Sequence, residues 1–183
     1  MHEIETARLR LRMLTRADLA ELTRIVADPE VMKYLGRVPG PLTAAEAEAF
    51  FDSVFAHWER HGFGRWAVVE KSTGQLVGCA GFRSHEGQAE LNYLLDRPHW
   101  GRGLGTEMAS ACLRAGFVRH GFGAVVAFTR PENAASRRVL EKAGMRYEGE
   151  AETHGVASVR YAITREEFER RGGAGRPDSA AEK

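Results

Sequence analysis

A glycine-rich segment near the middle of the chain has the residue types that bind phosphate groups. It runs Trp100-Gly-Arg-Gly-Leu-Gly-Thr106, where an apolar strand pattern gives way to a helical one. Glycines let the backbone approach a ligand, and successive N–H groups at a helix N-terminus favour a pyrophosphate. An ordinary turn uses the same residues, so both interpretations stay open. The spacings of a Rossmann fingerprint and of a P-loop are absent.

A second run could place a hydroxyl near that segment. It starts at Asn133, continues through Ser136, Leu140 and Lys142, and ends at Gly144. Asn133 is a good N-cap and Gly144 a good C-terminal stop, so helix physics explains both. It explains Ser136 less well, because a hydroxyl in the first turn lowers helix propensity unless it meets a partner.

Periodicity predicts the elements that must position these two runs. Alternating or β-rich segments predict strands over residues 8–14, 66–70, 76–82, 89–95, 124–129, 145–150 and 156–163. Helical spacing predicts helices over residues 15–28, 43–61, 108–118 and 133–143, a short helix or turn at 31–35 and a short helix after Thr164. Thr43 with Glu46 forms a capping box, and Ser72-Thr73-Gly74 predicts a hairpin turn.

Length and composition indicate one catalytic domain over residues 1–171. The 183 residues include 43% hydrophobic and 28% charged ones, a globular balance rather than a disordered one. The last segment, 172–183, is rich in Gly, Ala and charges and is predicted to be a disordered tail. A net charge of +1 gives no global field for nucleic acid or an anionic membrane.

Cys79 and Cys112 lie in apolar stretches without metal-ligand spacing. They predict buried thiols, no metal site and no disulfide framework. With no signal-peptide pattern and no apolar run near ~18 residues, we expect a soluble, cytoplasmic protein.

Together, the two chemistry-bearing runs resemble the GNAT superfamily of acyl-CoA-dependent acetyltransferases, in particular its Rim-type branch, named for ribosomal-protein-alanine acetyltransferases. The resemblance covers nearly the whole chain. Its segments occur in that branch's order: residues 8–12 (RLRLR), 28–32 (DPEVM), 66–70 (WAVVE), 78–82 (GCAGF), 90–95 (ELNYLL) and the N-x-x-S-x-x-x-L-x-K-x-G run. Trp100 replaces the Gln or Arg common elsewhere in the superfamily and suits this branch.

The resemblance implies an α/β (α+β) fold with a twisted, mixed, mostly antiparallel sheet flanked by helices, whose fourth and fifth strands splay apart to hold the pantetheine arm of acetyl-CoA. The implied cofactor-binding residues are Tyr93, Leu94 and Leu95 in the gap, Gly101, Arg102, Gly103, Leu104, Gly105 and Thr106 at the pyrophosphate, and Asn133 with Ser136 at the thioester end. Tyr34, Phe63 and His154 are implied to shape the acceptor pocket.

The family's alternative acid and base are missing. Leu140 and Phe128 stand where some members have a Tyr acid and a Glu base. The resemblance implies that Ser136 is the proton donor to the departing thiolate. Glu90 on the fourth strand is the candidate base, with the alternative that it only faces solvent. His57 and His154 are further options, although a lone His is more often structural.

We therefore expect an N-acetyltransferase that moves the acetyl group of acetyl-CoA directly to a primary amine, without a covalent enzyme intermediate. The amine would belong to a protein N-terminus or a small molecule, and the enzyme would be a monomer or homodimer. A non-catalytic acyl-CoA-binding or sensing protein of the same fold is the alternative.

Overall fold

One twisted sheet forms the centre of the molecule. The computed structural model describes residues 3–36, 40–153 and 155–172. Within these residues the sheet has eight strands in the order β1-β2-β3-β4-β5-β6-β8-β7, and every adjacent pair is antiparallel except β5 and β6. The strands are β1 (Ile4–Glu5), β2 (Leu9–Arg12), β3 (Arg65–Glu70), β4 (Leu76–His85), β5 (Gln88–Leu95), β6 (Ala124–Thr129), β7 (Arg146–Thr153) and β8 (Val156–Thr164).

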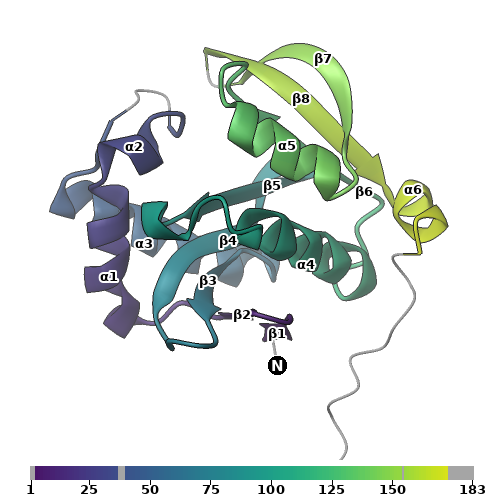
Figure 1. Ribbon diagram of the computed structural model, residues 1–183. Coiled ribbons are helices and arrows are strands. Elements are labelled where there is room, and N and C mark those ends of the chain that lie inside the picture. Colours follow the sequence, from purple (N-terminus) through teal and green to yellow (C-terminus); the bar gives the residue numbers. More distant parts are fainter. Residues whose placement is uncertain (1–2, 37–39, 154, 173–183) are drawn as a thin grey trace, which may run out of the picture.

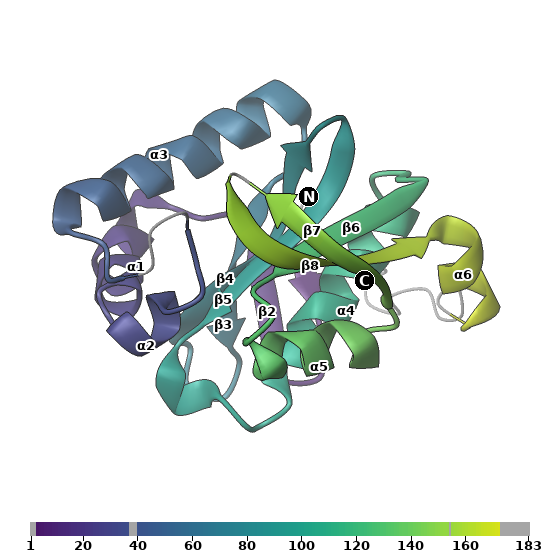
Figure 2. The same cartoon turned by 90° about the horizontal axis from the view of Figure 1, so that it is seen from above.

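Helices cover both faces of this sheet. They are α1 (Leu19–Val26), α2 (Pro29–Met32), α3 (Ala44–His61), α4 (Leu104–Val118), α5 (Ala134–Lys142) and α6 (Arg165–Arg170), with short 3₁₀ turns at Arg16–Asp18 and Arg97–His99. The sheet lies between α3 on one side and α4 with α5 on the other, while α1 and α2 lie at one end (Figures 1 and 2). The mixed α/β fold predicted from the sequence is therefore confirmed.

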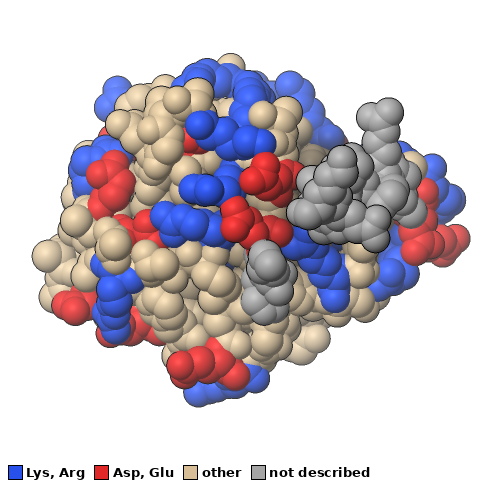
Figure 3. Space-filling model, turned by 90° about the horizontal axis from the view of Figure 1, so that it is seen from below, with Lys and Arg blue, Asp and Glu red and all other residues tan. Residues whose placement is uncertain are grey.

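The core fills the space between these layers. Its largest fully buried side chains include Trp66, Phe82 and Phe117, and the apolar faces of α3 and α4 supply Phe51 and Met108. On the face seen from below in Figure 3, Lys and Arg side chains are interspersed with Asp and Glu. No helix in the described ranges is long and apolar enough to cross a bilayer.

Local signals in the sequence predicted most boundaries. The Thr43–Glu46 capping box is present, and α3 ends at Gly62 in a left-handed conformation. The hairpin of β3 and β4 and the Asn133 cap of α5 are also confirmed. The start of α4 was predicted four residues too late, at Met108, because its first turn is rich in glycine. Strand β1 was missed; its two residues are too short for a periodic signal.

The predicted tail lies almost wholly outside the described residues. Gly172 follows α6 in a turn, and 173–183 are not described. The expectation of a disordered tail therefore stays a prediction.

Candidate active site

The site begins where β5 and β6 part. These parallel strands pair only at Ala89↔Val125 and Glu90↔Val126 and then diverge. The backbone N–H of Asp96 donates to the carbonyl of Val77 across β4 at 2.7 Å. Since hydrogen-bonded pairs alternate along an antiparallel ladder, the peptide groups of Tyr93 and Leu95 are directed toward the gap. The splayed strands expected from the sequence are confirmed.

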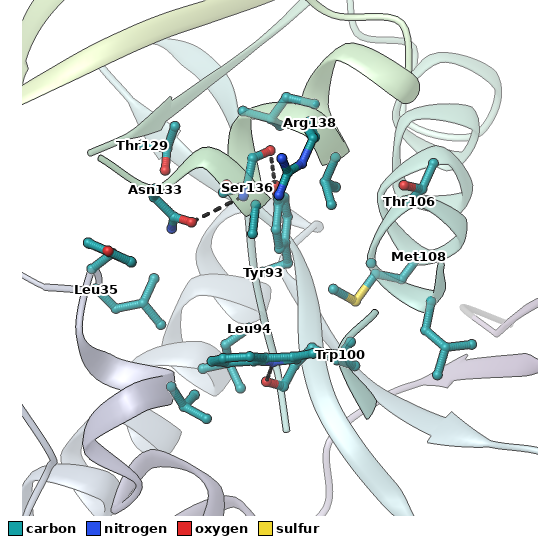
Figure 4. Close-up of a pocket in the computed structure, with 18 of the residues that line it drawn as sticks. Leu35, Tyr93, Leu94, Trp100, Thr106, Met108, Thr129, Asn133, Ser136 and Arg138 are labelled. Carbon is teal, nitrogen blue, oxygen red and sulfur yellow. Dashed lines mark hydrogen bonds between the residues drawn. The ribbon is translucent and has the colours of Figure 1, made fainter. Parts of the chain in front are cut away.

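A cavity of about 530 Å³ opens at this gap on the side of α4 and α5. Its walls come from β5, β6, the glycine segment, the start of α4, one face of α5, and α2 with the residues that follow it. Figure 4 shows that Tyr93 and Ser136 lie on one side of it and Trp100 on another. The Trp100 indole N–H donates to the carbonyl of Leu95 at 2.7 Å. This backbone carbonyl at the edge of β5 therefore already has a hydrogen-bond partner.

The glycine segment forms the N-terminal end of α4. Gly101 and Gly103 have φ of 71° and 79°, which glycine adopts without the steric penalty of a Cβ. The first helical bond runs from Glu107 N–H to the Gly103 carbonyl at 3.2 Å. The N–H groups of the three residues between them therefore have no intrahelical acceptor. With the helix dipole, they can bind a diphosphate.

We call the backbone of residues 101–106, with its free N–H groups, the cradle. The Arg102 side chain does not contribute to it. Its guanidinium lies 2.5 Å from Glu70 Oε1, and its carbonyl accepts a 2.8 Å bond from Arg8 Nη1. Its side chain is not among the cavity walls. The expectation that Arg102 contacts the ligand is limited to its backbone, because its charge is paired on the outside of the loop.

Replacing Gly105 should test the cradle. A Cβ at this position would lie 3.2 Å from Val139 Cγ2, so even a methyl group requires the Val139 side chain to shift slightly. We expect Gly105→Val to weaken coenzyme A binding by at least about tenfold. Crowding against Val139 should also cost about 1–3 kcal/mol of stability. Calorimetry and denaturant unfolding separate the two effects, with Gly105→Ala as the milder variant. A folded Gly105→Val protein that binds coenzyme A like the parent would contradict the cradle.

Two cations on α5 line the same cavity, and the sequence analysis assigned neither of them a role. Arg138 and Lys142 are exposed, stand four residues apart and therefore share a helix face. Figure 4 shows Arg138 near Ser136 on this helix. Their spacing within the N-x-x-S run was the available signal. Cations here complement phosphates bound at the start of α4.

Removing these charges should weaken binding without changing chemistry. We expect Arg138→Gln and Lys142→Gln each to raise the Kd for acetyl-CoA about 3- to 10-fold at low salt, less at high salt, because exposed charges are screened. The neighbouring Arg137 donates to Tyr161 and the Pro131 carbonyl and does not line the cavity, so Arg137→Gln is the matched control. Equal effects of all three variants, or no salt dependence, would count against a phosphate contact.

Ser136 and Tyr93 form a pair of hydroxyls at the gap. Ser136 Oγ lies 2.8 Å from Tyr93 Oη, and either can donate. The Asn133 side chain accepts the Ser136 N–H at 3.1 Å and so fixes the first turn of α5 (Figure 4). Burial raises the pKa of Tyr93 well above its ordinary value, so its phenol stays protonated. The structure thus brings both hydroxyls to the cavity, and Ser136 has the partner that its position required.

A second cavity of about 500 Å³ lies toward α3 and has walls from α1, α3, β3, β4 and β5. Four residues border both cavities: Leu35, Asn92, Tyr93 and Leu94. The two cavities therefore share a wall at the edge of β5 where the strands part. Two ligands, one bound in each cavity, would lie next to each other there.

Glu90 is not placed as a base. It is 3% exposed and lines neither cavity. Arg83 donates to its two carboxylate oxygens at 2.8 and 2.9 Å, and Asn92 donates at 2.8 Å. Neither the proposed role as base nor the alternative of a solvent-facing side chain fits, because Glu90 is a buried anion bound by neighbours on β4 and β5. It orients Arg83 and Asn92, which do line the second cavity.

The predicted acceptor residues fall in different places. Tyr34 lines the first cavity. Phe63 lines neither and packs with His57, His61 and Phe122 at ring distances of 5.0–5.7 Å. This role arises from aromatic packing between α3 and the sheet, which a single sequence does not reveal. His154 lies outside the described residues.

Apolar side chains occupy the two positions where the resemblance would allow a Tyr acid and a Glu base. Leu140 is 1% exposed on α5, and Phe128 lies on β6, and both border the first cavity. Within the described residues, no group of three or more His, Cys, Asp or Glu side chains is arranged to hold a metal ion.

A sheet parted at its parallel pair, with a glycine-lined helix N-terminus beside the gap, is the arrangement that the resemblance to acyl-CoA-dependent acetyltransferases implied. The chain belongs to the GNAT acetyltransferases, because the family profile described as "Acetyltransferase (GNAT) domain" matches residues 8–146.

Relatives and solved structures agree with this assignment. YkkB of Bacillus subtilis (strain 168) is 34% identical over 79% of this chain and 86% of its own. The uncharacterized N-acetyltransferase p20 of Bacillus licheniformis is 28% identical over 81% and 85%. The crystal structure of a GNAT acetyltransferase from Bacillus anthracis has a TM-score of 0.79 at 27% identity, covering 90% of this chain and 99% of that one. RimL, a ribosomal L7/L12 acetyltransferase solved with coenzyme A, shares the fold at 19% identity and a TM-score of 0.76, covering 89% and 98%.

Proposed function

We propose that this protein transfers the acetyl group of acetyl-CoA directly to a primary amine. The observation that carries the proposal is that two cavities share the diverging edge of β5 as a wall, beside the Ser136–Tyr93 pair. The donor occupies the side of α4 and α5, where the glycine segment, Arg138 and Lys142 suit its phosphates. RimL, which shares the fold, is described with coenzyme A, and this supports the choice of donor.

The edge of β5 positions the thioester. The pantetheine arm runs along Tyr93, Leu94 and Leu95 and pairs with the backbone groups that face the gap. The Leu95 carbonyl already accepts from Trp100, and the N–H groups of Tyr93 and Leu95 that face the gap are the donors for the thioester oxygen. A preorganised donor in a site shielded from water stabilises charge that develops on that oxygen.

The hydroxyls of Ser136 and Tyr93 assist the departure of the coenzyme A thiolate. Ser136 donates a proton to the departing thiolate sulfur, while Tyr93, whose phenol stays protonated, holds the Ser136 hydroxyl by the 2.8 Å hydrogen bond. The proton that the acylated amine gives up restores the Ser136 hydroxyl. No cysteine takes part: Cys79 is buried and free, and its burial raises the pKa of its thiol to about 11. The amine attacks in its neutral form, which the positive side chains of the second cavity favour.

The proposal also includes the branch of the family, the acceptor, the bounds of the catalytic domain, the oligomeric state and the location in the cell. The order of the sequence motifs supports placement in the Rim-type branch, and the acceptor is an amine on a protein N-terminus or a small molecule. Residues 1–171 form the catalytic unit, as a monomer or homodimer in the cytoplasm.

A panel of amines and peptide N-termini, assayed for free coenzyme A release, tests the proposal. Some amine should raise release at least about tenfold above hydrolysis without acceptor. Binding of acetyl-CoA without release by any amine would instead support a non-catalytic acyl-CoA-binding protein. One observation favours that alternative: no carboxylate base lines the second cavity in the described part of the chain.

A further inference from the structure

The second cavity has an unusual charge. Among its described lining residues are Arg65, Arg83 and His57, and no Asp or Glu. The Arg83 guanidinium forms an ion pair with the Glu90 carboxylate at 2.8 Å. The cavity nevertheless keeps one guanidinium whose charge the described chain does not pair.

That guanidinium belongs to Arg65, the first residue of β3. Its Nη2 donates to Asn92 Oδ1 at 3.0 Å, and its Cζ lies 5.1 Å from the centre of the Phe50 ring. No carboxylate of the described residues forms an ion pair with Arg65, whereas Arg12, Arg24 and Arg83 each bind a buried one. A partly buried guanidinium with one of its five donors used is arranged to bind an anion.

His57 on α3 gives a second, independent sign of a ligand. Its Nε2 is buried and has no hydrogen-bond partner, and the residue lines the same cavity. Burial lowers the pKa of His57 to about 4, with smaller contributions from nearby positive groups, so the ring is neutral near pH 7. A buried nitrogen without a partner is costly unless something fills the cavity and bonds to it.

The position of Asn92 connects this anion site to the chemistry. Asn92 borders both cavities and bonds to Arg65. A group held by Arg65 therefore lies next to the edge of β5 that both cavities border. Phe50, Val54, Leu42 and Met32 supply apolar walls around it.

We infer that the acceptor is a small amine that also carries a carboxylate, of the amino-acid class, with Arg65 binding the carboxylate. The inference rests on the proposed function and specifies its acceptor. The carboxylate pairs with the guanidinium, an apolar side chain fits against Phe50 and Val54, and the amino group reaches the gap. A polycationic acceptor would bring like charge against the Arg65 guanidinium and is disfavoured.

The experiment compares an amino acid with its amide. L-leucine and L-leucinamide differ only in the carboxylate, and the amide has the more readily deprotonated amine, so chemistry alone favours the amide. We expect kcat/KM for leucine to exceed that for leucinamide at least about tenfold. Spermidine and a short peptide N-terminus complete the acceptor set.

Variants assign the effect to Arg65. Arg65→Met should raise the KM for leucine about 10- to 100-fold and leave the KM for acetyl-CoA within about twofold, and Arg65→Lys should recover part of the loss. Arg170→Met, on α6 and exposed, is the control that should change nothing. Leucinamide kinetics should be unaffected by Arg65→Met.

The outcomes separate this inference from the proposed function. Turnover of leucinamide, spermidine or the peptide at least as good as that of leucine overturns the carboxylate site but keeps acetyl transfer. Equal losses for leucine and leucinamide in Arg65→Met also overturn it. Calorimetric binding of leucine that depends on Arg65, without coenzyme A release from any amine, supports the anion site and overturns acetyl transfer.

Discussion

Ser136→Ala should lower kcat about 100-fold or more while changing the KM for acetyl-CoA only a few-fold. Removing a positioned general acid costs about 10²- to 10⁴-fold in rate, whereas losing one neutral hydrogen bond costs about 1 kcal/mol. An interaction made only in the transition state appears in kcat, and a uniform binding contact appears in KM. Steady-state kinetics with a saturating acceptor therefore distinguish the two roles.

Tyr93→Phe is the matched variant, since it keeps the ring that borders both cavities and removes only Oη. If the two hydroxyls act as one unit across 2.8 Å, the double variant should be no slower than the slower single one. An unchanged kcat and a raised KM in Ser136→Ala would make Ser136 a binding residue, with the proton supplied by water.

Arg24→Met should destabilise the fold by about 3 kcal/mol, because it leaves a buried carboxylate without its cation. The carboxylate is that of Asp96, 3% exposed at the end of β5, and Arg24 binds it from α1. Because half of the Arg24 side chain is exposed, we place the loss at the low end for a buried pair. Urea unfolding measures it.

Arg16→Met gives the control, since Arg16 and Asp52 form an ion pair in which both side chains are more than half exposed. Its loss should be under about 1 kcal/mol. The double variant Arg24→Met with Asp96→Asn should recover part of the stability, because the amide is neutral. If Arg24→Met costs no more than Arg16→Met, the Asp96 carboxylate does not depend on this cation.

The sequence predicted the features that arise within a few residues of one another. The Thr43 capping box, the Asn133 cap and the glycine turn at Gly101 and Gly103 each follow from local backbone requirements, and all three are present. The binding of a diphosphate there stays a prediction. The diverging strands followed from the resemblance of the ordered motifs to a known family. Ser136 was singled out because its hydroxyl lacked a local reason, and the structure supplies Tyr93 as its partner.

What the sequence could not predict depends on contacts between distant elements. Glu90 has the residue type of a base, but its role is set by Arg83, which faces it across the β4–β5 ladder. Arg65 could be singled out only once the structure showed that, within the described residues, no carboxylate forms an ion pair with it. Phe63 was assigned to the acceptor by its position in the family pattern, and the aromatic cluster under α3 holds it instead.

The central claim is that the cavity beside α4 binds acetyl-CoA, and calorimetric titration tests it most directly. Acetyl-CoA and coenzyme A should bind with micromolar Kd, a free energy of about −8 kcal/mol, while ATP and NAD, which lack the pantetheine arm that pairs with β5, should bind far more weakly. Equal affinity for ATP and acetyl-CoA, or no detectable binding of acetyl-CoA, would contradict the account.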